Sequence, residues 1–278
     1  MYKRQTNIKA YVLSDPSDGK EHWVSHFKVP SANELLVILE TDEGIEGFGL
    51  ATSYTDISPL VYALTTGLTD LIIGADPLSP EQIYNKIFST SWKRISFERG
   101  WSREALVRLS AAVDIACWDI IGKKASLPLY QLMGGWCHEV PYYVTCAYYQ
   151  DGKDLSALRD EMERLKSQGH TRFKAKIGGL TLESDIERLE TIRDVIGFDA
   201  DLMVDVNRAW DLKTAIHAIE LLAPLKPRWL EEPLRWTDDR YETTLLAQKT
   251  HIPISGGESE ITLEGCRAFL DQRAISIL

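Results

Sequence analysis

The sequence has 278 residues, 44% of them apolar, with ordinary glycine and proline contents, so the chain can bury a large core and general disorder is excluded. Its 31 basic and 41 acidic side chains give a formal net charge of −10, which repels nucleic acids and acidic membrane surfaces. Small molecules are therefore the expected partners.

The N-terminal part predicts an α+β domain over residues 1–135. Three runs of β-type residues come first, at residues 8–13, 34–41 and 45–51, and the acidic turn Asp42-Glu43-Gly44 predicts a hairpin between the last two. Apolar residues then recur at helical spacing over residues 58–71 and 104–122. Strands followed by clustered helices are typical of an α+β arrangement.

After residue 135 the pattern changes to strands alternating with helices, which predicts parallel βα units and an α/β barrel domain over residues 136–278. The β-type segments are residues 140–149, 171–177, 201–207, 228–233, 252–258 and 274–278. A closed (β/α) barrel has eight strands and about 250 residues. With six strands, we expect either a part of a longer polypeptide or a barrel that cannot close.

Four charged residues recur at the ends of successive predicted strands. Lys176, Asp205, Glu231 and Glu258 are separated by 29, 26 and 27 positions, and each interval is one βα period. The carboxyl ends of parallel barrel strands meet on the face where catalysis takes place. Because side chains alternate along a strand, Lys174 is expected to face the same way as Lys176. The four charges are thus predicted to share one site.

These residue types predict a metal site and a base. Three carboxylates in one place repel one another unless a cation compensates them, and an all-oxygen ligand set from Asp205, Glu231 and Glu258 selects Mg²⁺. A cation of this kind offsets the second negative charge that forms when a carboxylate loses its α-proton. Lys176 is the predicted base, with its pKa lowered by the neighbouring charge of Lys174.

Each motif taken alone has an ordinary structural explanation. A Lys-x-Lys pair on a strand usually marks a solvated face, an Asp at a strand end is usually a cap or turn residue, and Glu-Glu-Pro is only a strand end. Their occurrence at successive strand ends, with inward parity, favours a common site.

The same residues resemble the enolase superfamily, and within it the mandelate racemase-like branch. The resemblance covers nearly the whole chain and is carried by Ser110 to Asp119, Gly122-Lys123, Leu132 to Gly135, Lys174-Ala175-Lys176, Met203 to Asn207, Trp229 to Pro233 and Gly256 to Ser259. It implies an N-terminal α+β capping domain followed by a TIM-like (β/α)7β barrel.

The resemblance also implies roles for individual residues. Asp205, Glu231 and Glu258 match the Mg²⁺ ligands, Lys176 matches the base and Lys174 its electrostatic helper. Asn207 matches a substrate contact near the metal. In the loops at residues 15–30 and 52–56, which resemble the loops that close over the substrate, the candidate substrate contacts are His22, Trp23 and Tyr54.

The activity implied is that of a lyase, a dehydratase that converts a sugar acid into a 2-keto-3-deoxy acid. A racemase or epimerase of an α-hydroxy acid is an alternative, and so is a catalytically inactive, truncated metal-binding homologue. The second acid or base of this branch, a histidine on strand seven, would come after residue 278, as would the strand-six lysine of the cycloisomerase branch. A homo-oligomer is the family's default.

Cysteine usage predicts a reduced, cytoplasmic protein. The four cysteines lie far apart without a Cys-x-x-Cys pair, and the N-terminal residues are polar and unlike a signal peptide.

Overall fold

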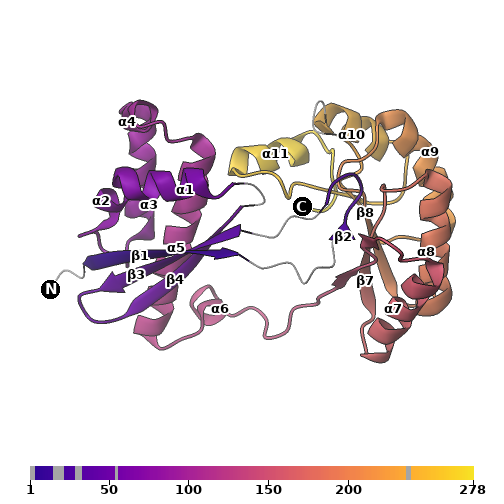
Figure 1. The fold of residues 1–278 in the computed structure, drawn as a ribbon, viewed down its shortest axis with the longest axis horizontal. Helices are drawn as coiled ribbons and strands as arrows, with labels where there is room; N and C mark the ends of the chain where they lie inside the picture. The colour runs from indigo at the N-terminus through magenta and orange to yellow at the C-terminus, as the bar shows by residue number, and fades with distance from the viewer. Residues whose placement is uncertain (1–3, 15–21, 29–32, 54–55, 236–238) are drawn as a thin grey trace. The chain divides into compact units, whose positions relative to one another are not determined.

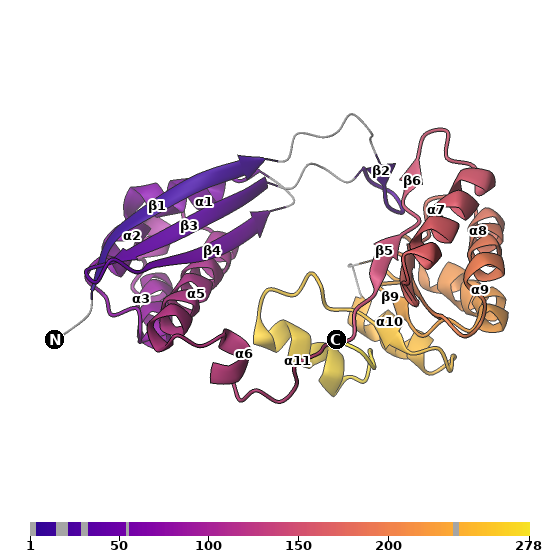
Figure 2. The same ribbon diagram turned by 90° about the horizontal axis from the view of Figure 1, so that it is seen from below.

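The computed structural model describes residues 4–14, 22–28, 33–53, 56–235 and 239–278. These residues form two compact units (Figures 1 and 2). The first unit contains residues 4–14 and 33–140, and the second contains residues 22–28 and 141–278. A short N-terminal stretch therefore belongs with the C-terminal unit, and we describe each unit by itself.

The first unit is built on a three-stranded antiparallel sheet in the order β1 (Gln5–Ser14), β3 (Asn33–Thr41) and β4 (Glu46–Ser53). Helix α5 (Arg103–Ala125) lies against β3 and β4 (Figure 2). A side chain at Gly49 would collide with the carbonyl group of Ala112 in this helix. The hairpin predicted between residues 34–41 and 45–51 matches the antiparallel pairing of β3 with β4.

The other helices of the first unit differ in part from the sequence pattern. They are α1 (Ser58–Ala63), the π-helical turn η1 (Leu64–Leu68), α2 (Thr69–Ile72), α3 (Pro80–Trp92), α4 (Ile95–Glu98) and α6 (Leu129–Leu132). The single helix predicted over residues 58–71 is interrupted because Gly67 adopts a φ of 129°, which only glycine reaches easily. Helix α3 has no counterpart among the segments with predicted helical spacing.

The second unit contains a five-stranded parallel sheet in the order β10-β9-β8-β7-β5. Its strands are β5 (Val144–Cys146), β7 (Arg172–Lys176), β8 (Asp201–Asp205), β9 (Leu230–Glu231) and β10 (Ile254–Ser255). The sixth predicted segment contributes a single parallel bridge between Ile277 and Ser255. Each of these five strands lies inside its predicted segment but is shorter. Only the residues within the bounds of each strand pair with a neighbouring strand.

Helices follow the strands of this unit. They are α7 (Leu155–Ser167), α8 (Leu182–Ile196), α9 (Leu212–Leu222) with the 3-10 turn η2 (Ala223–Leu225), α10 (Asp239–Ala247) and α11 (Leu263–Asp271). Of these, α7, α8, α9 and α11 begin at side-chain caps. The side chains of Asp154, Thr181, Asp211 and Thr262 each accept a hydrogen bond from an amide in the first turn. Among the described residues, no helix is both long and apolar enough to cross a membrane.

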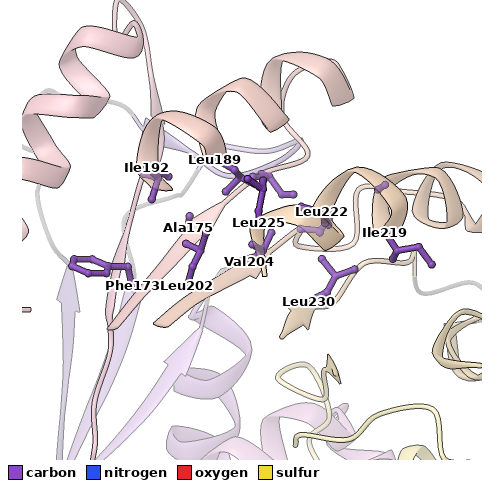
Figure 3. Close-up of a cluster of buried hydrophobic side chains, with 14 of the residues drawn as sticks. Phe173, Ala175, Leu189, Ile192, Leu202, Val204, Ile219, Leu222, Leu225 and Leu230 are labelled. Atoms are coloured by element: carbon purple, nitrogen blue, oxygen red, sulfur yellow. The ribbon is translucent and has the colours of Figure 1, made fainter. Parts of the chain in front are cut away.

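Alternation along the strands separates an apolar face from a charged face. Phe173, Ala175 and Val204 are fully buried and pack against the helices that carry Leu189 and Leu222 (Figure 3). Lys174 and Lys176 therefore project from the opposite face of β7. Helix packing thus fixes the direction in which the charged side chains point.

The first strand of this unit is broken at Ala147. The sequence predicts one strand over residues 140–149, but Ala147 has a φ of 58°, and the chain resumes as β6 (Tyr149–Gln150). β6 pairs in antiparallel orientation with β2 (His22–Trp23). This pairing joins residues 22–28 to the second unit.

Candidate active site

Two lysines stand at the carboxyl end of β7, and both are buried. The Lys176 ammonium donates to Asp205 Oδ2 at 2.6 Å and to Asn207 Oδ1 at 3.0 Å. The Lys174 ammonium lies 3.4 Å from the same Asp205 oxygen and donates to Glu231 Oε1 at 2.7 Å. Both cations therefore meet at one carboxylate oxygen.

Register between the strands brings these groups together. Lys176 pairs with Asp205 across β7 and β8, and Asp205 pairs with Glu231 across β8 and β9. Residues level with one another on neighbouring parallel strands point to the same face. Asp205 is fully buried, and its second oxygen accepts the Asn207 amide at 3.0 Å. Asn207 has a φ of 47°, in the left-handed region, and its side-chain oxygen accepts from Lys176.

Aromatic rings enclose the lysines. The Trp229 indole donates to Glu231 Oε2 at 2.9 Å, and the ring of Tyr143 meets Trp229 edge-on. The Lys174 ammonium lies 5.3 Å from the centre of the Tyr143 ring. Burial lowers the pKa of Lys174, but the charges of Asp205 and Glu231 and the hydrogen bond to Glu231 outweigh burial and leave this pKa above its usual range. Lys174 is therefore a fixed positive charge.

Glu258 lies apart from this group, beyond the end of β10. Its side chain is about half exposed at 47%, and one of its oxygens is 4.0 Å from Arg208 Nη1. The neighbouring Glu232 lies 3.3 Å from the same guanidinium nitrogen, which also donates to Ser259 Oγ. Burial, followed by the charge of Glu258, raises the pKa of Glu232 to about 8. Glu232 is not among the site residues predicted from the sequence, where its only signal is its place in the Glu-Glu-Pro triplet.

The predicted substrate contacts fall in two places. Asn207 lies at the lysines, whereas His22 and Trp23 lie on β2 against the rings of Tyr148 and Tyr149, at centroid distances of 5.1 and 6.1 Å. The Tyr148 ring centre is in turn 5.8 Å from the Lys176 ammonium. The fourth candidate, Tyr54, lies outside the described residues.

The donor set fits a hard divalent cation by its chemistry. Asp205, Glu231 and Glu258 offer only carboxylate oxygens, the ligands that Mg²⁺ prefers. Within the described parts of the chain, no three acidic, histidine or cysteine side chains are already arranged around a common point. Asp205 and Glu231 instead both contact the Lys174 ammonium. Two of the three predicted ligands therefore already face a common cation in the interior.

Family models match both parts of the chain. Residues 7–134 match the mandelate racemase / muconate lactonizing enzyme N-terminal domain, and residues 157–278 match the enolase C-terminal domain-like family. The chain belongs to the mandelate racemase and muconate lactonizing enzyme family of the enolase superfamily. An N-terminal capping domain and a C-terminal α/β barrel are the fold of this family.

Relatives in this family carry out more than one reaction. An arabinonate dehydratase from Saccharolobus solfataricus is 32% identical over 240 residues, which are 86% of this chain and 62% of that protein. A hydrophobic dipeptide epimerase from Enterococcus faecalis is also 32% identical, over 80% of this chain and 61% of that protein. The chain thus spans about three fifths of the length of these relatives.

A solved structure supports the fold assignment. A racemase from Streptomyces coelicolor A3(2), solved with bound magnesium, has 26% sequence identity and a TM-score of 0.87, and the match covers 98% of this chain and 74% of that one. The family, the fold and the range of reactions among relatives agree with the resemblance found in the motifs.

Proposed function

We propose that this chain carries the proton-abstracting site of a Mg²⁺-dependent dehydratase that converts a sugar acid into a 2-keto-3-deoxy acid. The observation that carries the proposal is the buried contact of the Lys176 ammonium with Asp205 and Asn207, at the carboxyl ends of neighbouring strands. Catalytic groups of parallel barrels are found at this edge.

Lys176 is the proposed base. Lys174 is its proposed electrostatic helper, since the ammonium groups of both lysines lie at the same Asp205 oxygen.

Asp205, Glu231 and Glu258 are the residues that would hold Mg²⁺. When bound, Mg²⁺ offsets the negative charge that develops on the substrate's carboxylate as the α-proton leaves. Asp205 and Glu231 are already neighbours, and Glu258 is supplied from the next strand end along the sheet. Asn207, His22 and Trp23 are the proposed contacts to the sugar acid, together with Tyr54 from the other predicted loop.

Dehydration is preferred because the arabinonate dehydratase, at 32% identity, matches 86% of this chain, against 80% for the epimerase. Loss of the α-proton is followed by departure of the β-hydroxyl as water, and the resulting enol becomes the keto acid. An epimerase is the second candidate, because an epimerase relative has the same identity and the two reactions share the first step. Only the fate of the intermediate separates them.

The test is a screen of sugar acids with the purified chain and Mg²⁺, beginning with arabinonate. Formation of a keto acid is the expected result. Return of inverted substrate with deuterium from D₂O would identify an epimerase instead. If neither product forms and no α-proton exchanges with D₂O while Mg²⁺ still binds, the chain is a metal-binding protein without catalysis and the proposal is wrong.

A further inference from the structure

The loop that follows β7 is held by two side chains from different elements. The amides of Gly178 and Leu180 donate to Asp185 Oδ2, at 2.7 and 3.4 Å, and the amide of Gly179 donates to the Tyr149 hydroxyl at 3.0 Å. The Tyr149 hydroxyl donates to the other oxygen of Asp185. Three consecutive amides are thus satisfied without any regular backbone ladder.

The two side chains are themselves fixed. Asp185 is fully buried and Tyr149 nearly so. The Arg188 guanidinium lies over the Tyr149 ring at 4.2 Å and donates to the carbonyl oxygen of Ala147 at 2.6 Å. Burial raises the pKa of Tyr149, and the charge of Asp185 raises it further, so the hydroxyl keeps its proton and remains a donor.

This network is not needed to begin helix α8. The N-cap of α8 is Thr181, whose side chain accepts the Ser184 amide. Asp185 lies in the first turn of the helix and directs its carboxylate backward to the loop instead. Thr181 therefore already caps the N-terminus of this helix, and the Asp185 carboxylate is not needed for capping.

The loop is continuous with the proposed base. Lys176 is the last residue of β7, and the next amide, that of Ile177, donates to the carbonyl oxygen of Asp205 at 3.0 Å. Space around the loop is limited, because a Cβ atom at Gly178 would lie 2.9 Å from Ala209 Cβ. Only Ile177 separates Lys176 from the three held amides.

We infer that Tyr149 and Asp185 are positioning residues, which clamp the end of β7 and thereby hold Lys176 at the distance from Asp205 and Asn207 that proton abstraction requires. The inference rests on the proposed function of Lys176 as a base. Since Tyr149 belongs to β6 and Asp185 to α8, the clamp joins a strand and a helix through the loop that follows β7.

The test is Tyr149→Phe, which keeps the ring and its contacts with Trp23 and Arg188 but removes the hydroxyl. Hydrogen exchange of the amides at residues 177–180 should become faster. With arabinonate as the probe, in the presence of Mg²⁺, kcat should fall by about 10- to 100-fold, because a small misplacement of a catalytic group has effects of this size. KM should stay within about twofold of its original value, since the substrate's own contacts are unchanged.

Asp185→Asn is the conservative second variant. The amide side chain can still accept from the loop but adds a donor facing Tyr149, so its kcat should lie between those of the unchanged protein and of Tyr149→Phe. Tyr142→Phe is the matched control, because Tyr142 Oη pairs with His170 Nδ1 at 3.0 Å before β5, away from the loop. It should leave both kcat and loop exchange unchanged.

The possible outcomes separate the two proposals. Unchanged amide exchange in Tyr149→Phe would overturn the clamp, and faster exchange with unchanged kcat would overturn its role in positioning Lys176. If the unsubstituted chain turns over no sugar acid, the proposed function fails, while the exchange measurement still decides whether the clamp holds the strand end.

Discussion

Two regions of the second unit use charge in opposite ways. On the outer surface, Arg159 and Asp194 form an ion pair between helices α7 and α8, with side chains 43% and 70% exposed. At the strand ends, the Lys174 and Lys176 side chains are 10% and 8% exposed, and Asp205 is fully buried. Exposed pairs contribute about 0–1 kcal/mol, whereas burying charges costs several kcal/mol before pairing offsets it.

The difference between the exposed ion pair and the buried charges indicates which of the two regions is the candidate active site. A fold gains little from gathering two lysines and two carboxylates in its interior, because apolar residues of similar volume often stabilise equally well. Buried charges that contact one another are common in active sites. The strand ends should therefore lose activity on substitution, and the helix surface should lose neither activity nor much stability.

The largest effect is expected for Lys176→Met, which keeps an apolar stem but removes the proposed base. Exchange of the substrate α-proton with D₂O should fall by about 10²- to 10⁴-fold, the usual contribution of a general base. Mass spectrometry of recovered arabinonate measures the exchange. Unaltered exchange would remove Lys176 from this role, and Arg159→Met serves as the surface control.

Glu231→Gln should weaken Mg²⁺ binding by at least about tenfold, because a neutral amide oxygen replaces a charged ligand. It also leaves the buried Lys174 with a weaker partner, so the free energy of unfolding should fall by about 3 kcal/mol. Titration calorimetry and urea unfolding measure the two effects. Mg²⁺ affinity equal to that of the unsubstituted chain would contradict the proposed metal site.

Arg159→Gln removes one partner of the exposed pair. The free energy of unfolding should change by less than about 1 kcal/mol, because solvent already screens the interaction. Turnover of arabinonate should not change. A loss of several kcal/mol in the free energy of unfolding would contradict the expected difference between the exposed ion pair and the buried charges.

The smallest effect concerns His26, whose pKa is lowered by burial and then by the charges of Arg208 and Arg235. A lowered pKa means that the folded protein binds this proton less readily than the unfolded chain. The contribution to stability is therefore present above pH 6.5 and is lost as the pH falls through the folded pKa. NMR titration should show a midpoint below 6.5, moved upward by Arg235→Gln and unmoved by Arg159→Gln.

Most of the fold could be predicted from the length of the βα repeat and from the alternation of side chains along the strands. The interval of one βα unit between Lys176, Asp205 and Glu231 placed these residues on adjacent strands, and alternation placed Lys174 on the same face as Lys176. These inferences depend only on repeat length and strand geometry, both of which are local properties of the chain. The family models and relatives agree with the fold and the family that the motifs indicated.

The remaining features depend on backbone angles and distant partners. The break at Ala147 occurs in a residue type that rarely has a positive φ, and nothing in the surrounding sequence marks it. Nothing in the sequence pattern marks Asp185, because its partners Tyr149 and Gly178 come from other segments. The roles of the predicted ligands and substrate contacts remain predictions.

The pairing of β2 with β6 bears on how the molecule could be divided. A cut in the chain near residue 135 would separate the barrel segment from His22 and Trp23. The remaining C-terminal fragment would expose the backbone of Tyr149 and Gln150 and one face of the Tyr149 ring. A recombinant barrel module made for biophysical study therefore needs residues 22–28 supplied as a peptide or joined by a redesigned connection.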